Sequence, residues 1–432
     1  MSRPMGPSSA TVGTPLRVAV MVDLPRAPNA GGHVLCWERL AAAAVACAGR
    51  LDLTLFFSGP EAAGEDWAGH VRLRTLPPVF STRRLAWLTG DLPDHTDLSP
   101  WHPLLAERLR SGFDVLHTTD GFFAFARTAA RVAACRRLPL VNSIHTATPD
   151  LARLFAARTL RRLLGSGRLG RLACGGLRLP DQAAAAKGRA LRRHQACCAH
   201  VLVSRPDDCR RALEVLPADR IHPLRRGVDR RLFSPARRDR AWLEREFRLP
   251  ADRLAVLYVG RMDPSKNVGR LAEGVRRAIA AGAPLALVCA GEGPERGAVL
   301  AALGERAICP GRVEGERLAR LYASADLFAL PSDIEICSNA VLEAQAAGLP
   351  VVVTARSGME LAIVPGRTGV VVPGDGPGPW AAALAALAAA PERLVSMRRA
   401  VRVGLGPRLP GWDDVLAEDL LPVWRLAAGR VP

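Results

Sequence analysis

The segment LAVLYVGRMDPSKNV, residues 254–268, indicates how this chain folds and where it binds a ligand. Its first six residues, 254–259, have the length and apolar character of a buried strand, and a helix is predicted from 268 to 281. A strand, a short loop and a helix in this order are the repeating unit of a parallel sheet. Such a sheet binds ligands at the carboxyl ends of its strands. Arg261 and Lys266 lie on that loop. The two cations suit a diphosphate, because Arg offers a bidentate fork and Lys a compact charge.

Short apolar runs alternate with amphipathic stretches along most of the chain, as they do in this segment. Strands are predicted at 16–22, 51–57, 71–76, 113–118, 139–144, 200–203, 254–259, 284–290, 307–310, 326–330, 350–353 and 369–372. Helices are predicted at 33–48, 121–136, 182–198, 268–281, 294–303, 316–323, 339–347, 380–389 and 411–427. The stretch 217–238 follows neither period and contains proline, glycine and charge, so it predicts a linker. We therefore expect an α/β fold of two doubly wound domains, which suits a chain of 432 residues.

The composition limits the classes of protein to consider. The formal net charge is +18, but Lys187 and Lys266 are the only lysines, which indicates a compositional bias toward arginine. Aromatic residues, on which nucleic-acid platforms rely, make up 5% of the chain. No apolar run reaches the ~18 residues of a membrane span, and residues 1–15 lack a signal-peptide core and predict a disordered arm. The ten cysteines include no CxxC pair. We expect reduced thiols, a cytoplasmic location, no metal and no nucleic-acid partner.

A second candidate segment, PSDIEICSNAVLEAQAAGLP, occupies residues 331–350. Glu335 falls on the loop after a predicted strand and Glu343 on the helix that follows. Ser338 and Asn339 are N-cap candidates for that helix, and its free amides and dipole favour an anion there. Carboxylates accept hydrogen bonds from paired sugar hydroxyls. The alternative is that both glutamates are ordinary exposed residues.

Two further candidates lie in the first half of the chain. Gly31 and Gly32 follow strand 16–22 and open a helix, where glycine lets backbone N–H groups approach an anion. His145 ends strand 139–144, at the carboxyl edge of the predicted sheet. The alternatives are an ordinary strand-to-helix turn and a histidine whose polar atoms are satisfied near the core.

In this order the residues resemble the retaining, metal-independent GT-B glycosyltransferases of family four, the glycosyl transferases group 1. The resemblance covers nearly the whole chain and is clearest over 221–373. It also includes Gly227-Val228-Asp229 with Phe233, Gly291 and Gly293 in AGEGP, and Gly311-Arg312-Val313. The family commonly has Glu-Gly-Phe-Gly where this chain has Glu335-Ile336-Cys337-Ser338, so the donor sugar stays open.

The resemblance implies two Rossmann-like domains, at 16–222 and 223–408, with a cleft between them and a C-terminal helix at 409–432 that crosses back to the first. It implies transfer of a hexose from a nucleotide sugar to an acceptor, such as a lipid-linked sugar or an envelope glycan. A nucleotide-sugar epimerase or phosphorylase of the same fold is the alternative. A basic nucleic-acid- or membrane-binding protein without catalysis is a weaker one.

The resemblance also assigns roles to residues. The catalytic set that it implies is His145, Glu335, Arg261 and Lys266. The donor-binding set is Gly31, Gly32, Arg261, Lys266, Arg312, Val313, Ser338, Asn339 and Glu343. In this scheme the two cations hold the diphosphate, Glu343 the ribose and Glu335 the transferred sugar, whose C6 side His145 approaches. Arg312 and Val313 lie near the base, which the main chain mostly binds. No metal and no other cofactor is implied.

The segment 151–193 is basic and apolar together. Arginines alternate with leucine and phenylalanine, and Asp181 is its only acidic residue. One interpretation is peripheral docking on an anionic membrane, at its inner face, with a lipid-linked acceptor. The other is a set of solvated helix faces in an arginine-biased chain. The sequence leaves both open.

Overall fold

A computed structural model of the chain describes residues 14–27, 30–85, 96–110, 112–165, 167–355 and 357–430. Of the predicted N-terminal arm, residues 1–13 lie outside this described part. The chain divides into two compact units, which we call unit 1 (Met1–Leu224 with Val415–Pro432) and unit 2 (Arg225–Asp414). The first division falls inside the stretch 217–238 that the sequence predicts to be a linker.

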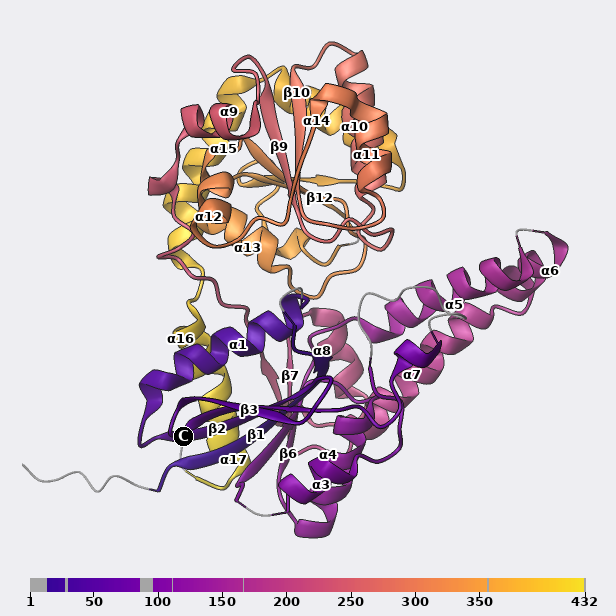
Figure 1. Cartoon of the computed structure of the whole chain (residues 1–432), viewed down its shortest axis with the longest axis vertical. Helices are drawn as coiled ribbons and strands as arrows, with labels where there is room; N and C mark the ends of the chain where they lie inside the picture. Colours follow the sequence, from indigo (N-terminus) through magenta and orange to yellow (C-terminus); the bar gives the residue numbers. More distant parts are fainter. Residues whose placement is uncertain are drawn as a thin grey trace, which may run out of the picture. The chain divides into compact units, whose positions relative to one another are not determined.

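Unit 1 is built on an eight-stranded sheet in the order β3-β4-β2-β1-β5-β6-β7-β8 (Figure 1). Its strands are β1 (Leu16–Pro25), β2 (Leu51–Ser58), β3 (Ala63–Ala68), β4 (Val71–Leu76), β5 (Val115–Thr118), β6 (Leu140–Ser143), β7 (His200–Val203) and β8 (Ile221–Pro223). All neighbours pair in parallel except β3 and β4, which are antiparallel. The central β1 buries Val18 through Val22 on both faces, as strands covered by helices do.

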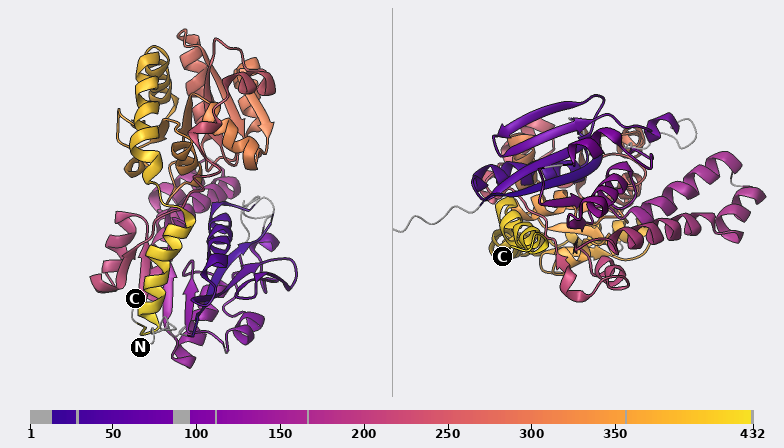
Figure 2. Two further views of the ribbon diagram at one scale, coloured as in Figure 1. Left: turned by 90° about the vertical axis from the view of Figure 1, so that its left-hand side faces the viewer. Right: turned by 90° about the horizontal axis from the view of Figure 1, so that it is seen from below.

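The helices of unit 1 fall between these strands. They are α1 (Gly32–Ala44), η1 (Val45–Cys47), η2 (Thr82–Leu85), α3 (Pro103–Arg108), α4 (Ala124–Arg136), α5 (Thr148–Leu164), α6 (Arg168–Arg171), η3 (Leu172–Gly176), α7 (Leu179–Gln195), α8 (Pro206–Leu213) and η4 (Ala218–Arg220). The helices α5 and α7 form a hairpin that extends away from the sheet of this unit (Figures 1 and 2). Among the described residues, no helix has both the length and the apolar character needed to cross a bilayer.

Unit 2 carries a six-stranded, wholly parallel sheet in the order β11-β10-β9-β12-β13-β14. Its strands are β9 (Leu254–Val259), β10 (Leu285–Ala290), β11 (Ala307–Gly311), β12 (Leu327–Leu330), β13 (Val351–Thr354) and β14 (Gly369–Val372). Its helices are η5 (Pro235–Arg237), α9 (Arg240–Phe247), α10 (Val268–Ala280), α11 (Arg296–Leu303), η6 (Gly304–Arg306), α12 (Gly315–Ser324), α13 (Asn339–Ala346), η7 (Glu360–Ala362), α14 (Pro377–Ala388), α15 (Pro391–Ala400), η8 (Val401–Leu405), η9 (Gly406–Arg408) and α16 (Trp412–Asp414).

Two apolar clusters, one on each face of this sheet, make the core of unit 2. One contains Tyr322 and Phe328, and the other contains Tyr258 and Trp380. Alternate residues of β9 belong to opposite clusters, because successive side chains of a strand point to opposite faces. Helices cover both faces, as the continuous apolar strands predict (Figure 1).

The end of the chain differs most from its prediction. The expected single helix 411–427 is divided into α16, the π-helical η10 (Val415–Leu420) and α17 (Leu421–Ala427). Pro422 lies in the first turn of α17, and proline has no N–H to continue the preceding hydrogen-bond ladder. The fully buried Trp424 fixes α17 to unit 1, where the segment lies beside the strands (Figure 2).

Candidate functional site

Three loops meet at the carboxyl edge of the unit 2 sheet, and their backbones are hydrogen-bonded to one another. Gly260 N donates to Ala290 O over 3.1 Å, and Met262 N donates to Glu292 O over 2.8 Å. Gly291 N donates in turn to Gly311 O over 2.8 Å. The loops after β9, β10 and β11 are therefore one connected layer. The glycines that the sequence singles out in AGEGP belong to it.

The structure brings Lys266 and Glu335 together at this edge. Lys266 Nζ lies 2.6 Å from Glu335 Oε1, although 69 positions separate them in the sequence. Both side chains are largely covered, with 23% and 13% of their surfaces exposed. The loop that carries Glu335 is held from its other side, because Glu335 N donates to Ser357 O over 3.1 Å. Two residues predicted to bind different parts of one ligand are thus in contact.

A second ion pair, which the sequence did not single out as a site, supports the same loop. Arg270 on α10 donates to both carboxylate oxygens of Asp333, over 2.8 and 2.7 Å. Asn267 Nδ2 donates to Asp333 Oδ2 over 2.9 Å and precedes α10 in the left-handed conformation, with φ of 55°. The spacing of Arg270 from Lys266 gives no signal for this pairing, because it depends on how β9 and β12 lie side by side.

Arg261 lies on the same loop as Lys266. Its Nε is 3.4 Å from Asp263 Oδ2, and its carbonyl oxygen accepts a 2.5 Å hydrogen bond from the Tyr258 hydroxyl. Burial raises the pKa of Tyr258 well above its usual value, so that hydroxyl stays protonated and keeps donating. The tyrosine therefore fixes the backbone at Arg261.

The helix α13 begins at Asn339 with Ser338 at the N-cap position, where the sequence places them. The Ser338 side chain makes no capping hydrogen bond, so its predicted capping role is wrong. Its backbone N–H instead lies 3.1 Å from Met359 Sδ. Glu343, on the second turn of the helix, is half-buried and acts electrostatically on the buried Tyr322. Burial and then the charge of Glu343 raise the pKa of Tyr322.

The two residues predicted near the base follow β11 and differ in exposure. Val313 is buried with one apolar cluster of unit 2. Arg312 has 41% of its side chain exposed and pairs with Glu314. Gly311 precedes them with a φ of 79°, a left-handed conformation that glycine adopts without strain.

In unit 1, the glycine loop and His145 also come together, through a residue that the sequence gave no reason to select. Gly31 is the N-cap of α1 and Gly32 its first residue. The next residue, His33, stacks on His145 with ring centroids 4.6 Å apart and an interplanar angle of 11°. Trp37 lies one turn further along α1, and its ring centroid is 5.5 Å from that of His145. The start of α1 therefore lies against the carboxyl end of β6.

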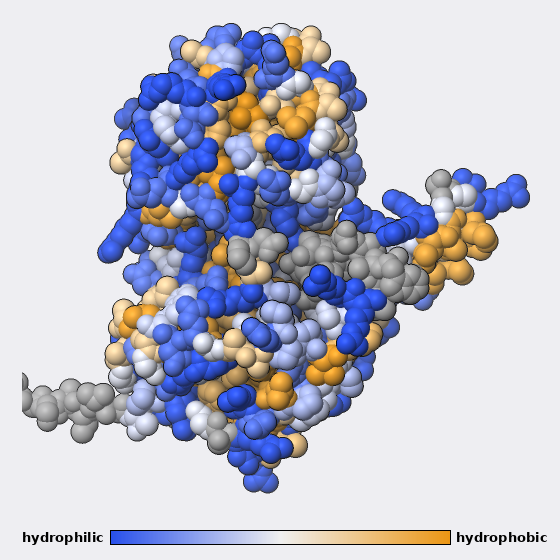
Figure 3. Space-filling view, in the orientation of Figure 1, coloured by the Kyte–Doolittle hydropathy of each residue, from blue (hydrophilic) through white to orange (hydrophobic). Residues whose placement is uncertain are grey.

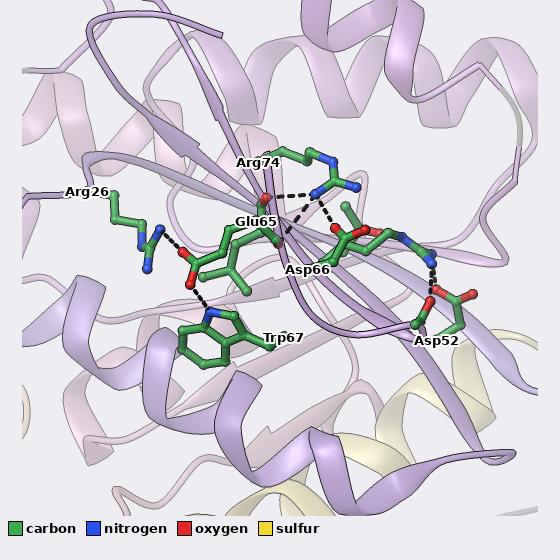
Figure 4. Close-up of polar contacts among 10 residues, drawn as sticks. Arg26, Asp52, Glu65, Asp66, Trp67 and Arg74 are labelled. Atoms are coloured by element: carbon green, nitrogen blue, oxygen red, sulfur yellow. Dashed lines mark hydrogen bonds and ion pairs between the residues drawn. The ribbon is translucent and has the colours of Figure 1, made fainter. Parts of the chain in front are cut away.

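Arg26, in the loop after β1, pairs with carboxylates from two elements, and Figure 4 shows its contact with Glu65. Arg26 donates to Glu38 on α1 over 2.6 Å and to Glu65 on β3 over 2.7 Å. Trp67 Nε1 donates to the second oxygen of Glu65 over 2.6 Å. The hydrogen bond from Arg26, followed by the one from Trp67, lowers the pKa of Glu65. The antiparallel β3, which was not predicted, thus helps to position the loop before Gly31.

A buried series of hydrogen bonds links Trp424 on α17 to His145. Trp424 Nε1 donates to His117 Nδ1 over 2.8 Å. His117 Nε2 lies 2.7 Å from Ser143 Oγ, which lies 2.8 Å from His145 Nε2. Burial lowers the pKa of His117 to about 3, so its ring is neutral at physiological pH. None of the described residues forms a His, Cys, Asp or Glu cluster suited to a metal ion.

Comparison with known proteins identifies a matching family for part of the chain. Residues 253–390 match the family model described as Glycosyl transferases group 1. Over this segment the chain is similar to the group 1 glycosyltransferases. The matched residues contain Arg261, Lys266, Glu335 and Glu343.

Curated relatives of this chain match over part of their length. One is the GDP-mannose-dependent alpha-mannosyltransferase of Mycolicibacterium smegmatis, 35% identical over 51% of this chain and 56% of that protein. Another is the D-inositol 3-phosphate glycosyltransferase of Segniliparus rotundus, 30% identical over 67% of this chain and 61% of that protein. The matched part of the chain thus spans little more than half of these relatives.

Solved structures show the fold of this chain over nearly its whole length. The sucrose-phosphate synthase of Thermosynechococcus elongatus has a TM-score of 0.65 at 20% identity and covers 93% of this chain and 97% of its own. HepE of Anabaena, solved in complex with UDP-glucose, has a TM-score of 0.63 at 15% identity and covers 96% of this chain and 98% of its own. The predicted GT-B fold of two Rossmann-like domains is confirmed.

Proposed function

We propose that this protein transfers a hexose from a nucleotide-sugar donor to an acceptor, with retention of anomeric configuration. The observation that carries the proposal is the contact between Lys266 and Glu335 at the carboxyl edge of the unit 2 sheet, beside the glycine loops and the start of α13. Ligands of open parallel sheets bind at that edge. A cation and a carboxylate in contact there suit a ligand whose phosphate and sugar are directly joined.

These positions support the following roles in unit 2. Lys266 and Arg261 would hold the diphosphate, because an ammonium has three N–H donors and can serve both Glu335 and a phosphate oxygen. Glu335 would accept hydrogen bonds from the sugar hydroxyls. Glu343 would bind the ribose, since a carboxylate accepts about four hydrogen bonds and can pair with two neighbouring hydroxyls. Arg312 and Val313 would lie near the base.

Unit 1 would supply the remaining groups. Gly31 and Gly32 form the start of α1, and the N-terminal end of a helix favours a phosphate. His145, stacked beside them on His33, would approach the C6 side of the sugar. As the sugar leaves the diphosphate, negative charge grows on the phosphates, and fixed cations with a helix dipole would stabilise it. We assign that work to protein cations without a divalent metal, and propose attack from the face of the departing phosphate.

A panel of nucleotides and nucleotide sugars tests this proposal. The relatives include a GDP-mannose-dependent enzyme and the Anabaena structure holds UDP-glucose, so UDP, GDP and ADP with their glucose and mannose derivatives are the choice. At about 100 times its dissociation constant the correct diphosphate should stabilise the protein by about 2.7 kcal/mol, measured as a thermal shift. Turnover should release a nucleoside diphosphate when an acceptor is present. Isomerised sugar would indicate an epimerase instead, and no shift with any member would contradict the proposal.

The hairpin of unit 1 supports a second proposal, peripheral docking on an anionic lipid surface that presents the acceptor. The helix α5 has no buried residue, and the leucines at the outer end of the hairpin are exposed (Figure 3). They are Leu163 (56%), Leu164 (41%), Leu169 (66%), Leu172 (53%) and Leu177 (53%). Exposed arginines lie among them, namely Arg161, Arg162, Arg168, Arg171 and Arg178. Leucines that insert between lipids and cations that meet their phosphates are the combination an anionic bilayer selects.

Replacing Leu169 and Leu172 together with serine should lower binding to vesicles that contain phosphatidylglycerol by more than about tenfold, since each buried leucine contributes about 1.5–3 kcal/mol. Co-sedimentation at low salt measures the bound fraction. Val395 and Val403, which are 68% and 73% exposed in unit 2, provide the matched serine control and should leave binding unchanged. Equal sedimentation with anionic and phosphatidylcholine vesicles, or equal loss in both variants, would rule out docking through the hairpin.

A further inference from the structure

The hydrogen bonds that end at His145 run in one direction, which the donors and acceptors themselves determine. The indole Nε1 of Trp424 can only donate, so His117 Nδ1 must accept. A neutral imidazole carries one proton, and that of His117 is therefore on Nε2, 2.7 Å from Ser143 Oγ. The Ser143 oxygen thus accepts from His117.

The hydroxyl proton of Ser143 then has one destination. Ser143 is fully buried, and within the described part of the chain its side chain has hydrogen-bond partners only in His117 and His145. A buried hydroxyl that donates to nothing costs about 1–3 kcal/mol. The proton therefore points to His145 Nε2, 2.8 Å away, and that nitrogen accepts. The remaining proton of a neutral His145 ring lies on Nδ1.

We propose that Trp424, His117 and Ser143 are positioning residues that hold His145 in the tautomer with its proton on Nδ1. The assignment of the tautomer depends only on unit 1. Its meaning for catalysis rests on the proposed function, in which His145 approaches the donor sugar. A histidine held in this form carries a hydrogen-bond donor at Nδ1, whereas the opposite tautomer would carry an acceptor there. It also gives a chemical role to α17, whose Trp424 supplies the first donor in the series.

Nitrogen NMR of histidine-labelled full-length protein tests the tautomer directly. The two ring nitrogens of His145, assigned by their loss in His145→Gln, should show Nε2 unprotonated and Nδ1 protonated. In Trp424→Phe nothing fixes the His117 tautomer, so Ser143 can donate to either histidine and the Nε2 signal of His145 should move toward the protonated position. Ser143→Ala should have the same effect and removes no aromatic packing.

Trp37 provides a matched control for the loss of an indole. Its ring centroid lies 5.1 Å from that of His117 and 5.5 Å from that of His145. Its Nε1 makes no hydrogen bond among the described residues. Trp37→Phe should therefore leave the His145 signals in place. The proposal is overturned by a protonated Nε2 in the unchanged protein. It is also overturned by equal shifts in Trp37→Phe and Trp424→Phe, or by no shift in either Trp424→Phe or Ser143→Ala.

Kinetics separate this proposal from the proposed function. With a donor found by the nucleotide panel, Trp424→Phe should lower kcat about tenfold or more with little change in KM, because the donor still binds to unit 2. A protein without turnover on any donor would contradict the proposed function and leave the NMR result standing. A fall in KM and kcat that Trp37→Phe shares would show a structural role for the indole and overturn the positioning role of Trp424.

Discussion

Lys266→Ala should lower turnover of the nucleotide-sugar donor by about a hundredfold, which corresponds to about 2.7 kcal/mol of transition-state stabilisation. Lys266 is one of two cations on the loop after β9, and its ammonium is already positioned by Glu335 at 2.6 Å. A charge held in place needs no reorganisation as the diphosphate departs, which is when negative charge on the leaving group is largest. The loss should therefore appear in kcat as well as in KM. Steady-state kinetics with the donor measure both.

Two variants distinguish a catalytic cation from general positive charge. Arg276→Ala removes a cation from the exposed surface of α10, where it pairs with Glu273, and should change turnover little. Lys266→Arg keeps the charge but exchanges a compact ammonium for a planar fork, so it should recover part of the activity. A loss of less than about tenfold, or about 1.4 kcal/mol, in Lys266→Ala would show that this lysine does not hold the diphosphate.

The sequence predicts the parallel parts of the fold well, because strands covered on both faces are continuous apolar runs. Every strand of the unit 2 sheet was predicted within two residues of its bounds. The strands that were missed are β3 and β8, which lie at the two edges of the unit 1 sheet. The residues of β3 are mostly exposed and include Glu65 and Asp66, so they lack the apolar signal. The helices α3, α5, α8, α9 and α15 also fall outside the predicted helices, and in α9 and α15 charged residues interrupt the apolar faces.

The residues of the candidate site could be predicted only where their place in the sequence, on a loop after an apolar strand, indicates that they lie at the ligand-binding edge. Lys266 and Glu335 could be selected because each lies on a loop after an apolar strand, and the order of strands in a parallel sheet places such loops together. The pair of Arg270 and Asp333 lies at the same edge but depends on side-chain directions that no periodicity encodes. The same is true of the contact between His117 and Trp424, which are 307 positions apart.

Gly291→Ala should cause the largest loss of stability, about 3 kcal/mol or more, because the layer of loops at the carboxyl edge of unit 2 has no room for a methyl group. Gly291 has a φ of 155°, and a Cβ built on it would lie 1.9 Å from Gly260 O. That oxygen belongs to the backbone and cannot rotate away, so the loops after β9 and β10 must separate. For a unit of this size the change should lower the melting temperature by roughly 6–12 °C, measured by calorimetry.

The neighbouring helix offers a glycine whose replacement should have the opposite effect. Gly297 lies in α11, and a Cβ built on it would meet nothing within 4 Å. Gly297→Ala should therefore leave unfolding unchanged or stabilise the protein by up to ~1 kcal/mol, since alanine is the better helix former. A melting temperature for Gly291→Ala within about 2 °C of that for Gly297→Ala would mean that the loops separate at little cost. Because Gly260 precedes Arg261, separated loops would also displace a proposed diphosphate ligand, so Gly291→Ala should weaken the stabilisation by the nucleoside diphosphate that Gly297→Ala retains.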